Sequence, residues 1–256
     1  MADAKAALRK SIRATLRALS PTAIAAASER ACARANTLIS AETSGVCCYL
    51  AMPKAECLTA PLLTQLFAAS KPVYVPRVTS MEDRHGMRML RVADAATLDN
   101  FPRSKWGIPE PTDEQCESME DGLETAAIEL VIVPGVAFDA SCRRLGQGRG
   151  YYDTFLEKLA AARKAKGLPP ALTIGLGLQE QLVDAVPVDA HDVPLDYVCL
   201  PDVLFSSSSS SAEAPASEDV PQQRSLRPKK AKLGETTTAP PPHPVHGRDT
   251  GLLPED

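Results

Sequence analysis

Residues 131–153, VIVPGVAFDASCRRLGQGRGYYD, decide the fold that we expect for this chain. They begin inside Leu130–Val133, an unbroken aliphatic run typical of a strand that helices bury on both faces. Pro134-Gly135 then bends the chain, and residues 151–166 are compatible with a helix. The stretch therefore predicts a central strand of a parallel sheet, followed by a loop and the start of a helix.

The loop in this stretch is rich in glycine and arginine. These residues are Arg143, Arg144, Gly146, Gly148, Arg149 and Gly150. Glycines let backbone N–H groups turn inward beside the partial positive charge of a helix N-terminus, which is a place that binds phosphate. The loop matches neither GxxxxGK[ST] nor GxGxxG, and a flexible connection with solvated arginines is the alternative. Because three arginines crowd the loop, we favour a nucleotide-phosphate site.

Length and composition exclude several classes of protein. The 256 residues are 44% hydrophobic, which is ample for a core, and the net charge of −4 gives no reason to expect nucleic acid or an anionic membrane as partner. No window approaches the roughly 20 apolar residues of a membrane span, and the first residues lack the apolar core of a signal peptide. We therefore expect a cytoplasmic protein.

The seven cysteines are scattered, without a CxxC pair, so we expect reduced thiols. Cys142 lies beside the arginines, where its pKa could fall, but no histidine nearby in the sequence could act as its base. We therefore disfavour a nucleophilic cysteine.

The rest of the chain alternates predicted helices and strands. Helices are expected at residues 2–19, 21–40, 62–69 and 151–166, and strands at 45–52, 72–78, 87–92, 130–133, 172–178 and 197–200. Ser20 is the expected N-cap of the second helix and Thr59 of the third, and the charged strand Met87–Val92 suits an edge of the sheet. This alternation predicts one three-layer α/β domain with a mainly parallel sheet over residues 1–205.

From Ser206 the composition changes to serine, proline, threonine and other polar residues. Such a segment cannot bury enough surface to offset its ordering entropy, so residues 206–256 are predicted to be a disordered tail. A basic cluster at residues 227–232, RPKKAK, leaves a nuclear address as an alternative to the cytoplasm.

RLGQGRGYYD at residues 144–153, preceded by PGVAFD at residues 134–139, resembles the signature of the 5-formyltetrahydrofolate cyclo-ligases, also called 5,10-methenyltetrahydrofolate synthetases. The likeness runs from about Lys5 to about Leu200. It implies a Rossmann-like α/β/α sandwich, ATP and Mg²⁺ as cofactors, and 5-formyltetrahydrofolate as the substrate. We expect the protein to act as a monomer.

The resemblance also implies roles for residues that are ambiguous by themselves. Lys5 and Arg9 lie one helical turn apart and match a pair that reaches the nucleotide phosphates, although a solvated basic face is the usual alternative. Glu56 matches an acid that contacts the folate, where an exposed loop acid is the alternative. Trp106 matches a tryptophan of the folate pocket rather than a core anchor. His191 is expected to be structural, with the neighbouring aspartate as a metal ligand.

The complete set of implied site residues is as follows. The ATP site comprises Lys5, Arg9, Arg144, Leu145, Gly146, Gln147, Gly148, Arg149, Gly150, Tyr151 and Tyr152; the folate site comprises Leu50, Met52, Glu56, Trp106, Tyr151 and Tyr152. The catalytic residues are Arg144, Arg149, Tyr151 and Tyr152, and the Mg²⁺ ligands are Asp153 and Asp192. The expected reaction converts 5-formyltetrahydrofolate and ATP to 5,10-methenyltetrahydrofolate, ADP and phosphate. Two alternatives stay open: an inactive binding paralogue, and an ATP hydrolase or kinase with another acceptor.

Overall fold

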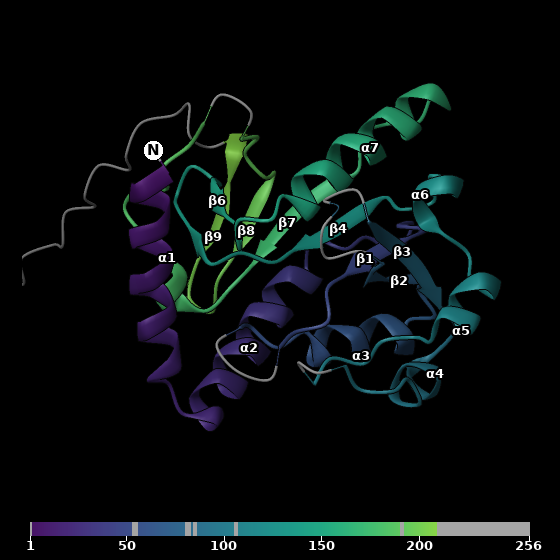
Figure 1. Ribbon diagram of the computed structural model, residues 1–256, viewed down its shortest axis with the longest axis horizontal. Helices are drawn as coiled ribbons and strands as arrows, with labels where there is room; N and C mark the ends of the chain where they lie inside the picture. The colour runs from purple at the N-terminus through teal and green to yellow at the C-terminus, as the bar shows by residue number, and fades with distance from the viewer. Residues whose placement is uncertain are drawn as a thin grey trace, which may run out of the picture. The chain divides into compact units, whose positions relative to one another are not determined.

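The aliphatic run Leu130–Val133 forms strand β4, which lies in the middle of a seven-stranded sheet in the computed structural model (Figure 1). The structure describes residues 2–52, 56–79, 83, 86–104, 107–189 and 192–208. The strand order is β3-β2-β1-β4-β7-β8-β9. The other six strands are β1 (Val46–Cys48), β2 (Val73–Val78), β3 (Met87–Val92), β7 (Leu172–Leu176), β8 (Tyr197–Cys199) and β9 (Leu204–Ser206).

The sheet is mixed but mostly parallel. β4 pairs in parallel with β1 and β7, and all four of its residues are buried, as the sequence predicted. β3 and β9 are antiparallel edge strands. β9 was not predicted, and its last residue, Ser206, pairs with Tyr197, so the sheet includes the first residue of the predicted tail. Residues 209–256 lie outside the described part of the chain, and the domain boundary and the disorder of the tail stay predictions.

Seven α-helices and a short 3₁₀ turn lie in the described part of the chain. They are α1 (Ala2–Arg17), α2 (Pro21–Asn36), α3 (Ala60–Ala68), α4 (Ala95–Asp99), α5 (Asp113–Ser118), α6 (Gly122–Thr125), α7 (Tyr151–Ala165) and η1 (Gln179–Gln181). Ser20 caps α2 by accepting a 3.1 Å hydrogen bond from Ala23 N, as predicted. Thr59 holds the N-cap position of α3, but its hydroxyl does not cap the helix; it donates to Tyr49 O at 2.8 Å. Thr59 therefore fastens the segment that follows β1.

The predicted three layers are confirmed by the way alternate strand residues divide between two apolar cores. Leu130 and Ile132 of β4 face the core that α1, α2 and α3 cover, whereas Val131 and Val133 face the core of α7. Figure 1 shows α1, α2 and α3 on one side of the sheet and α7 on the other. This alternation is the side-chain period of a strand buried on both faces.

The loop between β4 and α7 contains a small hairpin that the sequence did not reveal. β5 (Ala137–Phe138) pairs antiparallel with β6 (Arg144–Leu145). Buried Asp139 closes the turn between them, because its carboxylate accepts hydrogen bonds from Arg143 N at 3.1 Å and from Val186 N at 2.8 Å. The glycine-rich segment thus begins on a fixed support rather than on a loose loop.

Candidate active site

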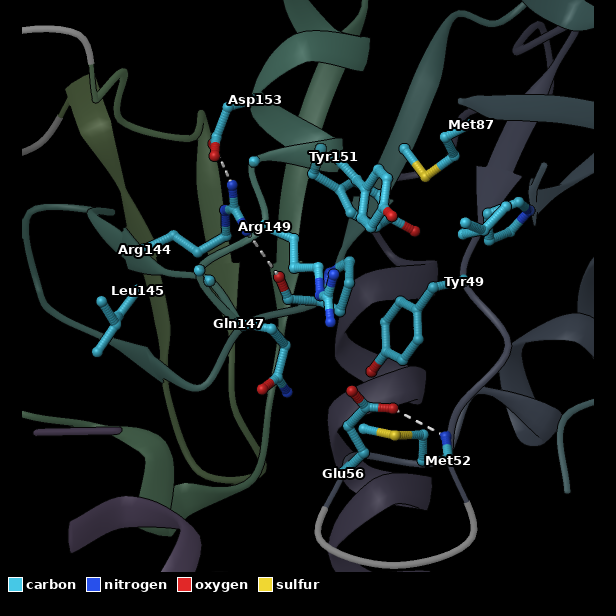
Figure 2. A pocket seen from close by; sticks show the side chains of 18 of the residues that line it. Tyr49, Met52, Glu56, Met87, Arg144, Leu145, Gln147, Arg149, Tyr151 and Asp153 are labelled. Carbon is cyan, nitrogen blue, oxygen red and sulfur yellow. Dashed lines mark hydrogen bonds and ion pairs between the residues drawn. The ribbon is translucent and has the colours of Figure 1, made fainter. Parts of the chain in front are cut away.

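The main pocket lies where the connections of the sheet reverse direction. From β1 the chain continues to β2 on one side, whereas β4, on the other side of β1, continues to β7. Open α/β sheets bind ligands in the crevice at such a switch point, at the carboxyl ends of the strands. Here a cavity of about 420 Å³ is lined by Tyr49 and Leu50 after β1, by Pro134 and Gly135 after β4, and by residues of α1 and α7 (Figure 2).

Every predicted site residue in the described part of the chain lines this cavity. They are Lys5, Arg9, Leu50, Met52, Glu56, Arg144, Leu145, Gly146, Gln147, Gly148, Arg149, Gly150, Tyr151, Tyr152, Asp153 and Asp192. Trp106 and His191 lie outside the described residues. The fold therefore brings together segments that are far apart in the sequence, although the role of each residue stays a prediction.

Helix α1 supplies cations to one half of the cavity, which we call the phosphate half because it contains the glycine-rich loop. Arg9 Nε donates to Gly146 O at 2.8 Å. Lys5 Nζ lies 2.8 Å from Asp189 Oδ2 and 2.6 Å from Asp192 Oδ2. Burial acts to lower the pKa of Lys5, but the hydrogen bonds to both aspartates outweigh it and raise the pKa. Arg9 is thus directed to the loop and Lys5 to the two aspartates, so the first two basic residues of α1 do not form a solvated face.

The glycines of the loop allow close approach of these cations. Gly148 has φ +97°, a left-handed conformation that glycine adopts without strain, and the Arg9 guanidinium lies against it. A Cβ at position 146 would lie 2.8 Å from a guanidinium nitrogen of Arg144. Glycine at 146 therefore gives the arginine room to lie over the loop.

Two neighbouring arginines have different partners. Arg144 lines the cavity, forms an ion pair with Asp153 and donates to Pro134 O at 3.3 Å. Arg143 does not line the cavity, because its Nε lies 2.6 Å from the buried carboxylate of Asp139. Of the three arginines that crowd the loop, Arg144 and Arg149 line the cavity, as predicted for these two, and Arg143 supports the hairpin instead.

The other half of the cavity, which we call the apolar half, was largely missed by the sequence analysis. Tyr49, Pro76, Val78, Met87 and Ile108 line it. Figure 2 shows Tyr49 and Met87 on the opposite side of the view from Arg144. Pro76 and Val78 lie on β2, and Met87 lies on β3. These residues are near β1 only because the strand order is β3-β2-β1.

Glu56 is a buried acid in the apolar half. Only 8% of the residue is exposed, and its Oε2 accepts a 2.8 Å hydrogen bond from Met52 N. Burial raises the pKa of its carboxyl to about 7, against the opposing effect of that hydrogen bond. An exposed loop acid is therefore excluded, and near neutral pH this carboxyl can either donate or accept a hydrogen bond.

Tyr152 brings an unpaired hydroxyl to the cavity. Its oxygen is buried and has no hydrogen-bond partner among the described residues. Burial raises its pKa well above the ordinary value, and Glu56 and Arg144 both influence it electrostatically, with opposite signs. The hydroxyl therefore stays protonated and is available as a hydrogen-bond donor. A buried polar group without a partner is uncommon in proteins, and a ligand that accepts a hydrogen bond would explain it here.

Cys142 is excluded as a nucleophile. The residue is fully buried, and burial together with Asp139 and Asp196 raises the pKa of its thiol to about 11. All seven cysteines are free and buried, in agreement with the expectation of reduced thiols.

The carboxylates in the phosphate half fit a magnesium ion that arrives with a nucleotide. Asp153 and Asp192 both line the cavity beside the glycine-rich loop. The described residues contain no group of three or more His, Cys, Asp or Glu side chains that could hold a metal by themselves. Mg²⁺ does not require such a group, since it commonly takes one or two carboxylates and completes its shell with phosphate oxygens and water.

A protein-family model described as the 5-formyltetrahydrofolate cyclo-ligase family matches residues 1–201. This chain belongs to that family. Its named relatives are ligases, so it is an enzyme of the same kind.

Individual relatives are named for the same activity as the family model. The probable cyclo-ligase of Schizosaccharomyces pombe is 34% identical over 163 residues, which cover 62% of this chain and 76% of that protein. The cyclo-ligase of Saccharomyces cerevisiae is 31% identical over 208 residues, which cover 76% of this chain and 93% of that protein. The solved structure of the Aquifex aeolicus 5,10-methenyltetrahydrofolate synthetase has a TM-score of 0.62 and 24% identity over 86% of this chain and 99% of that one, which supports the fold.

The cellular location remains a prediction. Within the described residues, no helix is both long and apolar enough to cross a membrane. The name of the Arabidopsis thaliana cyclo-ligase, 32% identical over 77% of this chain and 74% of that protein, assigns that relative to mitochondria. The cytoplasmic location and the monomeric state predicted from the sequence are therefore not tested.

Proposed function

We propose that this protein converts 5-formyltetrahydrofolate and ATP to 5,10-methenyltetrahydrofolate, ADP and phosphate, with Mg²⁺ bound to the nucleotide as a cofactor. One observation carries the proposal: a single cavity joins a half rich in cations and glycines to an apolar half with a buried carboxyl. A cyclo-ligase needs both, because a phosphoryl group must reach the formyl oxygen of a bulky ring system that has apolar faces and a hydrogen-bonding edge.

The phosphate half is suited to hold the triphosphate. Arg144 and Arg149 supply charge-assisted hydrogen bonds, Lys5 and Arg9 add charge from α1, and the amides that open α7 favour an anion. Asp153 and Asp192 would hold the magnesium ion, which when bound neutralises phosphate charge and polarises the phosphoryl group. The protein thus contributes position and charge, which are its main roles in phosphoryl transfer.

The apolar half is suited to hold the pterin. Leu50, Met52 and Met87 provide apolar surface, and Tyr151 lies where the two halves meet. Glu56 can bond the pterin edge as donor or acceptor, since its pKa is about 7. The resemblance to the family also assigns Trp106, which lies outside the described residues, to folate binding.

The reaction divides into two steps in which all atoms are accounted for. The formyl oxygen attacks the γ-phosphorus, the bond from that phosphorus to the bridging oxygen breaks, and ADP leaves with the electron pair. The formyl carbon, still bonded to N5, now bears a phosphate ester. N10 adds to this carbon and loses its proton, after which the carbon–oxygen bond breaks and phosphate departs. The formyl oxygen therefore ends in the released phosphate.

An isotope experiment tests this proposal. The full chain is incubated with Mg-ATP and 5-formyltetrahydrofolate labelled with heavy oxygen in the formyl group, while product absorbance and phosphate mass are recorded. We expect methenyl product and labelled phosphate in equal amounts. Unlabelled phosphate without methenyl product would indicate a hydrolase, a phosphorylated acceptor a kinase, and binding without turnover an inactive paralogue. Unlabelled phosphate together with methenyl product would contradict the first step.

A further inference from the structure

Three aspartates already pair with cations that would receive phosphate. Lys5 Nζ lies 2.8 Å from Asp189 and 2.6 Å from Asp192, and Arg144 pairs with Asp153. The side chains of Lys5 and Arg144 are only 13% and 8% exposed. A phosphate group that binds these cations must therefore displace or share their present partners.

Free and metal-bound nucleotides differ in how they can make this exchange. If a free nucleotide displaces the aspartates, the carboxylates remain unpaired beside a strongly anionic phosphate chain, and like charges at short range repel. If a divalent cation arrives with the nucleotide, Asp153 and Asp192 gain a new positive partner while the lysine and arginine turn to phosphate. Only the second exchange gives the two carboxylates that line the cavity, Asp153 and Asp192, a new positive partner, whereas Asp189 gives up Lys5 in both exchanges.

Asp189 has a distinct place in this arrangement. It does not line the cavity, and 52% of its side chain is exposed. Its backbone N–H nevertheless donates to Asp192 Oδ2 at 2.8 Å, while its carboxylate accepts from Lys5. It therefore holds both a cation and a metal-ligand candidate without reaching the ligand itself.

We propose that Asp189 is a positioning residue that acts through Lys5, and that the ion pairs of Asp153 and Asp192 with Arg144 and Lys5 are what couple nucleotide binding to the metal. This inference rests on the proposed nucleotide-binding role of the phosphate half. Its consequence is a positive coupling between the metal and the nucleotide that Asp153 and Asp192 create and that the removal of either one weakens, whereas the removal of Asp189 frees Lys5 with or without the metal. Coupling between ligands is reciprocal, so the metal must also bind better with nucleotide present.

Calorimetric titration with an ATP analogue that has an imido bridge between its β- and γ-phosphates measures this coupling without turnover. The full chain is titrated in Mg²⁺ and in EDTA. We expect Mg²⁺ to tighten binding to the wild type by about tenfold or more, inside the usual range of roughly 5- to 150-fold. Asp153→Asn, Asp189→Asn and Asp192→Asn should each tighten binding in EDTA. The metal effect should shrink in Asp153→Asn and Asp192→Asn and persist in Asp189→Asn.

Two controls distinguish the loss of a specific ion pair from the general effect of removing one negative charge from the protein. Asp202→Asn removes a carboxylate from an exposed pair with Arg30, 3.4 Å long and away from the cavity, and should leave binding unchanged. In a Lys5→Gln background, Asp189→Asn should no longer tighten binding in EDTA, because the two residues act as a pair. Equal tightening by Asp202→Asn, or persistence of the Asp189→Asn effect without the lysine, would overturn the proposal.

The failure of this inference differs from failure of the proposed function. A wild type that binds the analogue equally well in Mg²⁺ and EDTA, with asparagine variants that change nothing, overturns the coupling and leaves the nucleotide site intact. A wild type that binds no analogue in either buffer overturns the proposed function and this inference with it. Melting temperatures of all variants confirm that each one is folded.

Discussion

The two halves of the cavity satisfy their polar groups in different ways. In the phosphate half, Lys5 and Arg144 already pair with aspartates, so a ligand must exchange partners with them. Glu56, in the apolar half, is buried, and burial raises the pKa of its carboxyl to about 7. The hydroxyl of Tyr152 has no hydrogen-bond partner among the described residues. In our proposal the first half sets selectivity through competing charges, whereas the second offers hydrogen-bonding groups to a ligand.

The largest expected effect concerns the buried carboxyl of the apolar half. Its pKa is raised to about 7 in the folded protein, above the ordinary value of about 4.3. The stability that protonated Glu56 confers is fully present below the unfolded pKa and is lost as pH rises through the folded pKa. Between pH 5 and pH 8 the wild type should lose roughly 2–3 kcal/mol relative to Glu56→Gln, which cannot ionise.

Denaturant unfolding of both proteins at a series of pH values measures this difference. If the difference in unfolding free energy between the two proteins is the same at every pH, the carboxyl has its ordinary pKa in the folded protein and is not desolvated. The comparison of the two halves would then fail, since Glu56 would carry a charge as the aspartates do.

The next effect distinguishes two adjacent arginines. Arg144→Ala should lower kcat/KM for ATP about ten- to a hundredfold, because a charge-assisted hydrogen bond to phosphate contributes roughly 1.5–3 kcal/mol. Arg143→Ala is the matched control: it leaves a buried Asp139 without its guanidinium, so it should lower the melting temperature and spare kcat/KM for ATP. If both variants keep the kcat/KM for ATP of the wild type, Arg144 does not bind the nucleotide.

The same pair of arginines shows how far the sequence can predict this molecule. Contiguous features were predictable: the aliphatic run of β4, the cap at Ser20 and the glycine-rich loop each depend on neighbouring residues. Arg143 and Arg144 could not be separated, because their different directions follow from the hairpin β5–β6, which has only two residues in each strand. In an extended segment, adjacent side chains point to opposite faces.

The apolar half illustrates a second limit. Pro76 and Met87 reach the cavity because β2 lies beside β1 and β3 beside β2, and that strand order depends on contacts between distant segments. β9 escaped notice because its end runs into serines that, in sequence, are typical of a tail. Local composition therefore predicted the glycine-rich loop, and the resemblance to the family supplied the more distant residues that line the cavity, whereas Pro76, Val78 and Met87 required the topology of the sheet.

The smallest expected effect comes from removing one of two tyrosine hydroxyls. Both tyrosines, Tyr49 and Tyr152, line the cavity. Tyr49 donates a 2.8 Å hydrogen bond to Cys57 O, so Tyr49→Phe leaves a buried carbonyl unpaired and should lower stability by about 1–3 kcal/mol. Tyr152 has a buried hydroxyl with no partner in the described part of the chain. Tyr152→Phe should therefore keep or raise the melting temperature, since it removes a desolvated group that no protein atom compensates.

Catalysis should show the reverse order. If the Tyr152 hydroxyl donates to a ligand at the junction of the two halves, its removal should lower kcat/KM roughly two- to tenfold, as expected for one hydrogen bond of about 0.5–1.5 kcal/mol. Melting curves and steady-state kinetics on Tyr49→Phe and Tyr152→Phe provide both readouts on matched substitutions. Loss of stability in Tyr152→Phe would mean that the hydroxyl has a structural partner. Unchanged kinetics would mean that no ligand uses it, and the apolar half would then bind its substrate through Glu56 and shape alone.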